Sequence, residues 1–375
     1  MRYGPLSVLQ QNNKANTAYG ISMITVLGAG LVGSAIIQDL SADFDVTAFD
    51  KSRKALDGLD IRKKYSDDIF SRRNVLEASE IVVTTLPGSI SYAVVKKLLR
   101  MGKAVVDTSF MEEDPFTLDE TARRHRAIYV PDAGYAPGAT NILSGRMYKK
   151  ERVKKIEIIV AGLPVSCTEP FRHAVTFNVE GLIDEYTRPA RIMRAGKVET
   201  VDPLSEISAV PFSGSMYEAF YSDGLRTLLR TVGVEEMFEK TLRYPGHLQA
   251  MKQLRDFGYF SNDKVDGIVP RKLTESLFGR FGTDFRDMCL TRVTGFNERK
   301  LEYTNVDRYD RKTGTKSMAR MTGYSAAAMA RILAGGMVDA KGVYPPEYFG
   351  FFDREFDTFI ALLRKRGIRF SYTET

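Results

Sequence analysis

A glycine-rich stretch near the start of the chain has the spacing of a dinucleotide-binding loop. Residues 28–33 run Gly28-Ala29-Gly30-Leu31-Val32-Gly33, which is Gly-x-Gly-x-x-Gly, and an acidic residue, Asp50, follows about 20 residues further on. We expect Gly28 to form a tight turn, Gly30 to let the backbone approach a pyrophosphate, and Gly33 to let a helix pack closely on a strand. The helix that starts at Leu31 and Val32 would present N–H groups to the phosphates.

Asp50 predicts which dinucleotide binds. A carboxylate at the end of the second strand hydrogen-bonds the adenosine ribose hydroxyls and repels a 2′-phosphate, so we expect NAD rather than NADP. Lys51 and Arg53 follow directly and would accommodate the phosphate if Asp50 turned away. Asp67, or its neighbour Asp68, would hydrogen-bond the adenine edge, unless it caps a helix in solvent.

Polar residues end three later strands, where the carboxyl edge of a parallel sheet binds ligands. Thr85-Leu86-Pro87 is expected to lie beside the nicotinamide and its ribose. Asp107 and Asp132 are candidate proton acceptors, although Asp107 would also suit a helix N-cap and Asp132 a backbone turn. Tyr135 would wall the nicotinamide side or donate a hydrogen bond, or else belong to the core.

Strands and helices alternate from Met23 onward, which predicts βαβ units and a parallel sheet. Apolar, β-branched segments predict strands at 23–27, 44–49, 81–86, 104–106 and 127–130. Segments with helical spacing lie between them at 31–40, 68–78, 89–100 and 114–126. The fold class is therefore α/β, a Rossmann doubly wound parallel sheet. Residues 1–22 are expected to be an extension.

The pattern changes after Tyr148. Mixed polar and apolar positions at 153–160, and near 174–179, 190–194, 206–212 and 238–244, predict strands with one wet face. These indicate an inserted α+β domain on a mainly antiparallel sheet. Helices are expected at 323–333 and 352–363, separated by Pro345-Pro346.

Composition excludes several classes. The 375 residues are 43% hydrophobic, enough for two cores, and no apolar run reaches the roughly 20 residues of a membrane helix. The formal charge of +7 is dispersed, which favours a solvated surface over a nucleic-acid partner. Cys167 and Cys289 are too few for a disulfide framework or a metal site, so we expect a reducing, cytoplasmic setting and no metal.

Longer strings resemble the saccharopine dehydrogenase-like family, and within it most closely the L-lysine 6-dehydrogenases. The similar segments follow the family order along most of the chain. They are Asp132-Ala133-Gly134-Tyr135-Ala136-Pro137-Gly138-Ala139-Thr140-Asn141, Ala161-Gly162-Leu163-Pro164, Glu218-Ala219-Phe220-Tyr221-Ser222-Asp223-Gly224-Leu225, Thr241-Leu242-Arg243-Tyr244-Pro245-Gly246-His247, Lys341-Gly342-Val343 and Pro346-Glu347. Saccharopine-forming relatives carry an Asp in a GLDPG string where this chain has Ala136.

The resemblance implies an NAD(P)-dependent enzyme acting at a carbon–nitrogen bond of an amino acid. It also implies that the carboxyl-terminal helices return to the Rossmann domain. We therefore predict a Rossmann domain of 23–134 and 324–375 and a substrate and oligomerisation domain of 135–323. By analogy with the family, a homodimer or larger homo-oligomer is expected.

The predicted reaction is oxidative deamination of the lysine ε-amine to allysine, which can cyclise, with release of ammonia. Because that amine has a pKa near ~10.4, a nearby base or a desolvated pocket is required. Candidate bases are Asp107, Asp132 and His247; the alternative for His247 is a residue that starts a helix and caps or packs there. For the substrate carboxylate, Arg243 is the first candidate, Arg191 the second and Arg226 the third. An internal salt bridge from Arg243 to Glu218 or Asp223 is the alternative, and either acid would suit the α-amine.

Two other functions fit the same residues. A saccharopine- or carboxynorspermidine-type reductase would use this scaffold to join an amine to a carbonyl partner, with no release of ammonia. A non-catalytic NAD-binding module would be stabilised by NAD without turnover.

Overall fold

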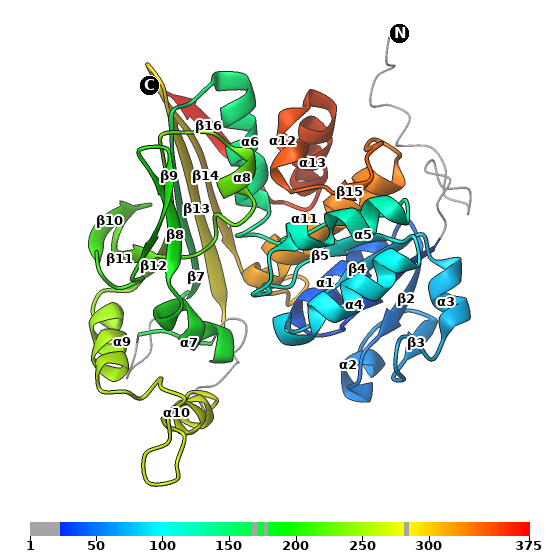
Figure 1. Ribbon diagram of the computed structural model, residues 1–375, viewed down its shortest axis with the longest axis horizontal. Helices are drawn as coiled ribbons and strands as arrows, with labels where there is room; N and C mark the ends of the chain where they lie inside the picture. Colours follow the sequence, from blue (N-terminus) through cyan, green and yellow to red (C-terminus); the bar gives the residue numbers. More distant parts are fainter. Residues whose placement is uncertain (1–22, 167–171, 176–178, 281–284) are drawn as a thin grey trace. The chain divides into compact units, whose positions relative to one another are not determined.

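The computed structural model describes residues 23–166, 172–175, 179–280 and 285–375, which form two compact units. The first unit is the chain up to Ala133 together with Ala326–Pro345, and the second is Gly134–Ser325 together with Pro346–Thr375. Figure 1 labels their elements. The expected extension at 1–22 and Cys167 lie outside the described residues.

The first unit is built on a parallel sheet of seven strands in the order β15-β6-β5-β4-β1-β2-β3. This is the Rossmann order with one strand added beside β6, which confirms the predicted fold class. The strands are β1 (Met23–Leu27), β2 (Asp45–Phe49), β3 (Lys63–Tyr65), β4 (Ile81–Thr84), β5 (Ala104–Asp107), β6 (Ile128–Val130) and β15 (Gly342–Val343).

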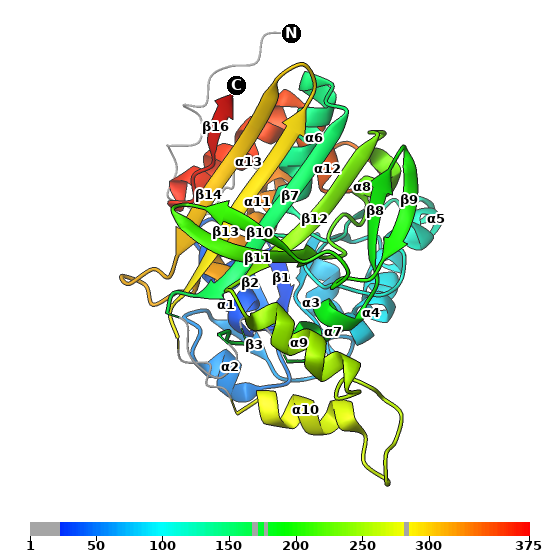
Figure 2. The same cartoon turned by 90° about the vertical axis from the view of Figure 1, so that its left-hand side faces the viewer.

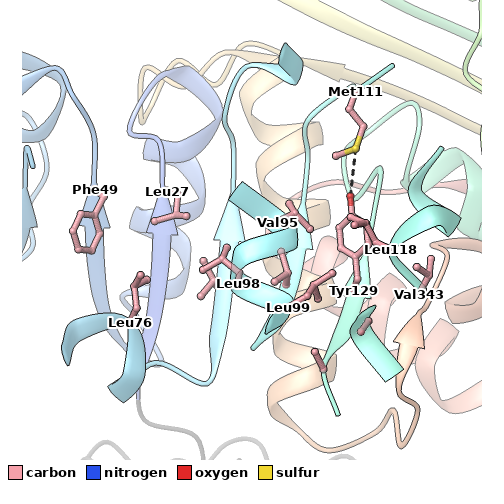
Figure 3. Packing of buried hydrophobic residues seen from close by; sticks show 14 residues of the cluster. Leu27, Phe49, Leu76, Val95, Leu98, Leu99, Met111, Leu118, Tyr129 and Val343 are labelled. Atoms are coloured by element: carbon pink, nitrogen blue, oxygen red, sulfur yellow. Dashed lines mark hydrogen bonds between the residues drawn. The ribbon is translucent and has the colours of Figure 1, made fainter. Parts of the chain in front are cut away.

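Helices connect these strands, and the direction of the crossover decides which face each covers. Because β1 leads outward to β2 while β4 leads outward to β5, α1 and α4 fall on opposite faces. On the α4 face, Val95, Leu98 and Leu99 pack against strand residues in a fully buried cluster (Figure 3). The helices are α1 (Leu31–Leu40), α2 (Arg53–Asp57), α3 (Arg73–Ala78), α4 (Gly88–Arg100), a 3₁₀ turn (Pro115–Leu118) and α5 (Asp119–Arg124).

The second unit contains a mixed sheet of nine strands, whose main path runs β10-β11-β12-β7-β13-β14-β16 (Figure 2). Only β12 and β7 pair in parallel; the other pairs are antiparallel, including β8 with β12 and with β9. The strands are β7 (Lys155–Pro164), β8 (Ala190–Arg194), β9 (Lys197–Val201), β10 (Ser208–Phe212), β11 (Ser215–Tyr221), β12 (Glu236–Arg243), β13 (Asp287–Phe296), β14 (Lys300–Arg308) and β16 (Ser371–Glu374).

Helices α7 (Val179–Thr187), α9 (His247–Asp256) and α10 (Pro270–Phe278) gather at one end of this sheet (Figure 2). A buried cluster that includes Ile183, Phe220 and Met251 holds them there. The remaining helices are α6 (Ala139–Glu151), α8 (Leu228–Thr231), α11 (Ser317–Ala334), α12 (Glu347–Phe351) and α13 (Asp353–Lys365). Part of the strand predicted near 174–179 falls on residues 176–178, which lie outside the described residues; Ala174 and Val175 belong to no helix or strand, and α7 begins at Val179.

The carboxyl-terminal segment divides between the units, so the predicted return of all of 324–375 to the Rossmann domain is wrong for 346–375. Within the first unit, β15 pairs with β6, and Arg331 bonds Asp43 at 2.8 Å and also pairs with Asp39. Within the second unit, β16 pairs with β14. There α12 also packs on α6, with a Cβ added at Gly350 falling 2.1 Å from the carbonyl oxygen of Ile142. Edge pairing and this close helix contact therefore hold the last 30 residues in the second unit.

Candidate active site

The glycine loop between β1 and α1 needs two of its glycines for internal packing. Gly28 has φ +99°, and a Cβ there would lie 2.3 Å from Thr85 Oγ1. A Cβ on Gly33 would lie 2.0 Å from the carbonyl oxygen of Gly28. Both positions therefore exclude any larger residue, as the motif predicts.

Gly30 differs, because a Cβ added there would meet nothing within 4 Å. No close contact with the described residues therefore requires a glycine at this position, and the space above the loop is open. The ten-residue helix α1 begins next to it, with no side-chain cap and no acidic residue in its first turn. Leu31 is exposed and Val32 half-buried at this end. These features fit the pyrophosphate of a dinucleotide, since the loop N–H groups and the helix dipole favour an anion.

Asp50 lies directly beside this loop, at the carboxyl end of β2. Its Oδ2 accepts a hydrogen bond from the Ala29 N–H at 2.6 Å, and its Oδ1 accepts one from the Ser52 N–H at 2.7 Å. The carboxylate thus occupies the position from which the predicted ribose contact would be made. Lys51 and Arg53 follow it and are exposed.

Other predicted cofactor residues have partners within the first unit. Asp67 is exposed and pairs with Arg72 at 2.7 Å. The Thr85 hydroxyl donates to the carbonyl oxygen of Leu27 at 3.1 Å, so it braces the glycine loop from behind. Leu86 accepts a hydrogen bond from Ser109 Oγ on its carbonyl, and Pro87 is the exposed N-cap of α4.

Asp107 is a structural carboxylate and is poorly suited to be the predicted base. It is fully buried, and burial raises its pKa. Its oxygens accept hydrogen bonds from four groups: Thr84 Oγ1 at 2.6 Å, Ser91 Oγ at 3.1 Å, the Ser109 N–H at 2.9 Å and Tyr129 Oη at 3.2 Å. Figure 3 shows Tyr129, whose hydroxyl also contacts the Met111 sulfur. The carboxylate ties β4, β5, β6 and α4 together, and Asp114 rather than Asp107 caps the next helical turn.

Asp132 and Tyr135 flank the boundary between the units in the sequence. Asp132 is buried and has a left-handed backbone, with φ +51°. The Tyr135 hydroxyl donates to the carbonyl oxygen of Leu290 at 2.5 Å and lies 3.0 Å from Thr291 Oγ1. These two hydrogen bonds anchor the Tyr135 loop to β13. Burial raises the pKa of Tyr135 well above its usual value.

Arg243, predicted to bind the substrate carboxylate, is paired with an acid of the second unit. Its side chain is only 2% exposed and forms an ion pair with Glu185 of α7. Its Nε donates to the Tyr186 hydroxyl at 2.9 Å, and that oxygen lies 2.8 Å from Nε2 of His247. The guanidinium charge is therefore neutralised inside the second unit, by a residue other than Glu218 or Asp223.

The remaining predicted substrate residues also bind one another. Arg191 pairs with Asp223 through two hydrogen bonds, Nε to Oδ1 at 2.9 Å and Nη2 to Oδ2 at 2.7 Å. Asp223 in addition accepts the Arg191 N–H at 3.0 Å. This bidentate pair positions the loop after β11 against β8. Arg226 is buried with φ +50°.

His247 is the first residue of α9. This position is the alternative to its predicted role as a base. Glu218 accepts hydrogen bonds from the N–H groups of Gly246 at 3.0 Å and Leu248 at 3.4 Å. The family-like segment that begins at Glu218 therefore caps α9, the helix that begins at His247. The His247 ring is buried and packs against the His173 ring, with centroids 5.0 Å apart and planes tilted by 59°. Burial, reinforced by the Arg243 charge, lowers the pKa of His173 well below its usual value.

Sequence reasoning missed Glu239, which lies on β12 among these motifs. Its side chain is buried, its Oε1 accepts from Ser222 Oγ at 2.8 Å, and its Oε2 has no partner among the described residues. Burial raises its pKa to about 8. The alternation of side chains along β12 could have identified it. One face of this strand carries Met237, Glu239, Thr241 and Arg243, and three of these four residues are polar.

None of the helices in the described residues is long and apolar enough to cross a membrane. Nor do these residues contain a group of three or more His, Cys, Asp or Glu side chains that could hold a metal ion.

Comparison with known proteins identifies relatives for both parts of the chain. A family model described as the saccharopine dehydrogenase NADP binding domain matches residues 24–130, and one described as the saccharopine dehydrogenase C-terminal domain matches residues 134–368. An α-aminoadipic semialdehyde synthase of Arabidopsis thaliana is 25% identical over 201 residues, 49% of this chain and 19% of that protein. A saccharopine dehydrogenase (NADP⁺, L-glutamate-forming) of Pyricularia oryzae is 23% identical over 233 residues, 57% of this chain and 52% of that protein. The matched region thus spans about a fifth and about half of these relatives.

Solved structures show the same fold. Saccharopine dehydrogenase (L-Glu forming) of Saccharomyces cerevisiae has a TM-score of 0.75 at 18% identity, covering 94% of this chain and all of that one. Homospermidine synthase of Legionella pneumophila, in complex with NAD, has a TM-score of 0.64 at 12% identity, covering 94% of this chain and 91% of that one. With the two family models matched in sequence order along most of its length, the chain belongs to the saccharopine dehydrogenase family.

Proposed function

We propose that this protein is an NAD-dependent amino-acid dehydrogenase that oxidises the ε-amine of L-lysine to allysine and releases ammonia. The observation that carries the proposal is the open cradle at Gly30 and the α1 N-terminus with Asp50 beside it, in a chain of the saccharopine dehydrogenase family. When bound, the dinucleotide supplies the hydride acceptor. The loop and α1 would hold its pyrophosphate, and Asp50 its ribose hydroxyls.

The preference for NAD rests on Asp50. A carboxylate in this place disfavours a 2′-phosphate, whereas the exposed Lys51 and Arg53 would favour one. The hydrogen bonds from Ala29 and Ser52 hold Asp50 facing the loop, which supports NAD.

The preference for lysine rests on what the chain lacks. Ala136 stands where saccharopine-forming relatives carry an aspartate. Arg191 and Arg243, the cations that a second or third substrate carboxylate would need, are paired inside the protein. A small substrate with a single carboxylate suits this arrangement better than saccharopine.

The experiment is an assay with L-lysine and either NAD⁺ or NADP⁺ that records reduced cofactor and ammonia together. We expect equal amounts of both products with lysine and NAD⁺, and a smaller rate with NADP⁺. Ornithine as substrate would keep the chemistry and change only the pocket.

A saccharopine-type reductase is the second candidate, favoured by the names of the matched relatives. It would consume reduced cofactor when given an amine and a carbonyl partner, and it would release no ammonia. Stabilisation by NAD without turnover of any amino acid or amine would instead indicate a binding module. The homodimer or larger homo-oligomer and the cytoplasmic setting stay predictions, to be checked by molar mass in solution and by cell fractionation.

A further inference from the structure

Among the buried polar side chains of the second unit, one carboxylate has an oxygen with no hydrogen-bond partner in the described residues. Glu239 is 3% exposed, and only its Oε1 has a hydrogen-bond partner among the described residues, Ser222 Oγ at 2.8 Å. Buried polar atoms are almost always paired, so an exception calls for a ligand, a water molecule or a catalytic role. Building on the proposed amine oxidation, we infer that Glu239 binds the reacting amine of the substrate as its ammonium and accepts the proton that this amine must lose.

The hydrogen bonds around Glu239 orient the carboxylate. Thr241 Oγ1 donates to Ser222 Oγ at 2.9 Å, and Ser222 in turn donates to Glu239 Oε1. Gly224 allows the carboxylate its place, because a Cβ there would fall 1.9 Å from Oε1. These contacts hold one oxygen and leave Oε2 for an external donor. A primary ammonium suits that oxygen, since it brings up to three N–H donors and the opposite charge.

The arginines in the neighbouring motifs do not supply that charge. Arg191 binds both oxygens of Asp223, and Arg243 binds Glu185. Neither arginine can supply a cation to Glu239 while its own ion pair stays intact. A bound substrate amine meets the need without breaking either pair.

The charges that face Glu239 oppose its ionisation when no amine is present. Burial raises its pKa to about 8, the acids Asp223 and Glu185 add to this, and the Ser222 hydrogen bond lowers it. Tyr135, a further titratable neighbour, is itself held neutral by burial. At neutral pH the resting group is then mostly the carboxylic acid. It ionises when an ammonium binds, which releases one proton.

The proton transfer that follows is simple. One N–H bond of the substrate ammonium breaks, an O–H bond forms at Glu239 Oε2, and the electron pair stays on nitrogen. The neutral amine then has the lone pair that its oxidation requires. This transfer returns Glu239 to the carboxylic acid, its resting state at neutral pH, so the proton that reaches solvent in each turnover is the one released when the ammonium binds.

The test is calorimetric binding of L-lysine to the full-length protein without cofactor, in buffers from pH 6 to 8. For wild type we expect affinity to rise about tenfold per pH unit from pH 6 to 7 and less steeply towards pH 8, with about one proton released per lysine bound at pH 6.5. Glu239→Gln keeps the shape and removes the charge. It should bind lysine about 100-fold more weakly at pH 8 and release no proton. Glu236→Gln, the same change at the exposed start of β12, should behave as wild type.

A second variant guards against misfolding of the first. Ser222→Ala removes the hydrogen bond that lowers the Glu239 pKa, so the pH dependence of lysine binding should move to higher pH. NAD binding and the midpoint of thermal unfolding report whether each variant is folded. 6-Hydroxynorleucine, which has a hydroxyl in place of the ε-amine, should bind wild type and Glu239→Gln equally.

Equal lysine binding by wild type and Glu239→Gln, with the same pH dependence, overturns the inference even if wild type oxidises lysine. Conversely, binding that depends on Glu239 supports it even if lysine is not oxidised, and the proposed function alone then fails.

Discussion

At the scale of single residues, charge type is a poor guide to ligand contacts in this chain. Arg243 and Arg191 have the side chain best suited to bind a substrate carboxylate, yet each forms an ion pair with an acidic residue of the second unit. Asp107 has the chemistry of a base, yet four hydrogen bonds fix it inside the first unit. Gly30, with open space above it, and Glu239, with an unpartnered oxygen, are better guides because something outside the described residues can occupy their surroundings.

Asp50 carries a prediction about cofactor choice. Asp50→Ser removes the charge that repels a 2′-phosphate and leaves Lys51 and Arg53 in place. We expect the ratio of kcat/KM with NAD⁺ to that with NADP⁺ to fall about 10- to 100-fold, an effect of roughly 1.4 to 2.7 kcal/mol. Steady-state kinetics with both cofactors measures it. Asp45→Ser is the control, because Asp45 is an exposed acid, paired with Lys63, at the start of β2, the strand that ends just before Asp50. An unchanged ratio in Asp50→Ser would remove Asp50 from the cofactor site.

At the scale of elements, the sequence predicts what depends on local pattern. The residues of α1, Leu31–Leu40, follow from the glycine motif and helical spacing, and β1 follows from a β-branched run. The helix expected at 114–126 is broken into a 3₁₀ turn and α5, because Asp114 and Pro115 start one turn and Asp119 the next. The Arg243–Glu185 pair escaped prediction because its partners are 58 residues apart and meet only after α7 packs beside β12.

Substitutions in the loop between β1 and α1 should distinguish glycines needed for packing from the glycine needed for cofactor binding. Gly30→Ala adds a methyl group where nothing lies within 4 Å, so the variant should fold with its thermal midpoint unchanged. That methyl group would occupy the space of the pyrophosphate, and we expect the Kd for NAD⁺ to rise at least about tenfold. Gly33→Ala, by contrast, should destabilise the unit, because its Cβ falls 2.0 Å from a backbone oxygen.

Thermal melts and fluorescence titration with reduced cofactor measure both effects. Gly58→Ala serves as the control, since Gly58 also has open space around its Cβ position but lies at the end of α2. Unchanged cofactor affinity in Gly30→Ala would show that the space above the loop is not where the pyrophosphate binds.

At the scale of the whole molecule, the chain uses its carboxyl-terminal segment twice. Residues 326–345 complete the first unit through β15 and Arg331, and residues 346–375 complete the second through α12 and β16. A discontinuous Rossmann domain could be foreseen from the family resemblance. The point of division could not, because it depends on β16 pairing with β14, a contact between segments more than 60 residues apart that no local pattern records.

This division makes a prediction about ligands in the intact protein. If the first unit holds the dinucleotide and the second holds the amine, each ligand should stabilise its own set of amides against hydrogen exchange. At 100 times its Kd a ligand adds about 2.7 kcal/mol to the stability of the state it binds. We expect NAD⁺ to slow exchange in peptides covering 28–34 and 50–53. L-Lysine alone should slow exchange in peptides covering 222–224 and 239–241, while the exposed strand β9 serves as the internal control.

Exchange measured by mass spectrometry on the full chain distinguishes the outcomes. Protection by lysine confined to the first unit would contradict the placement of the amine site beside Glu239, whereas protection by lysine that is lost in Glu239→Gln and kept in Glu236→Gln would tie it to that carboxylate.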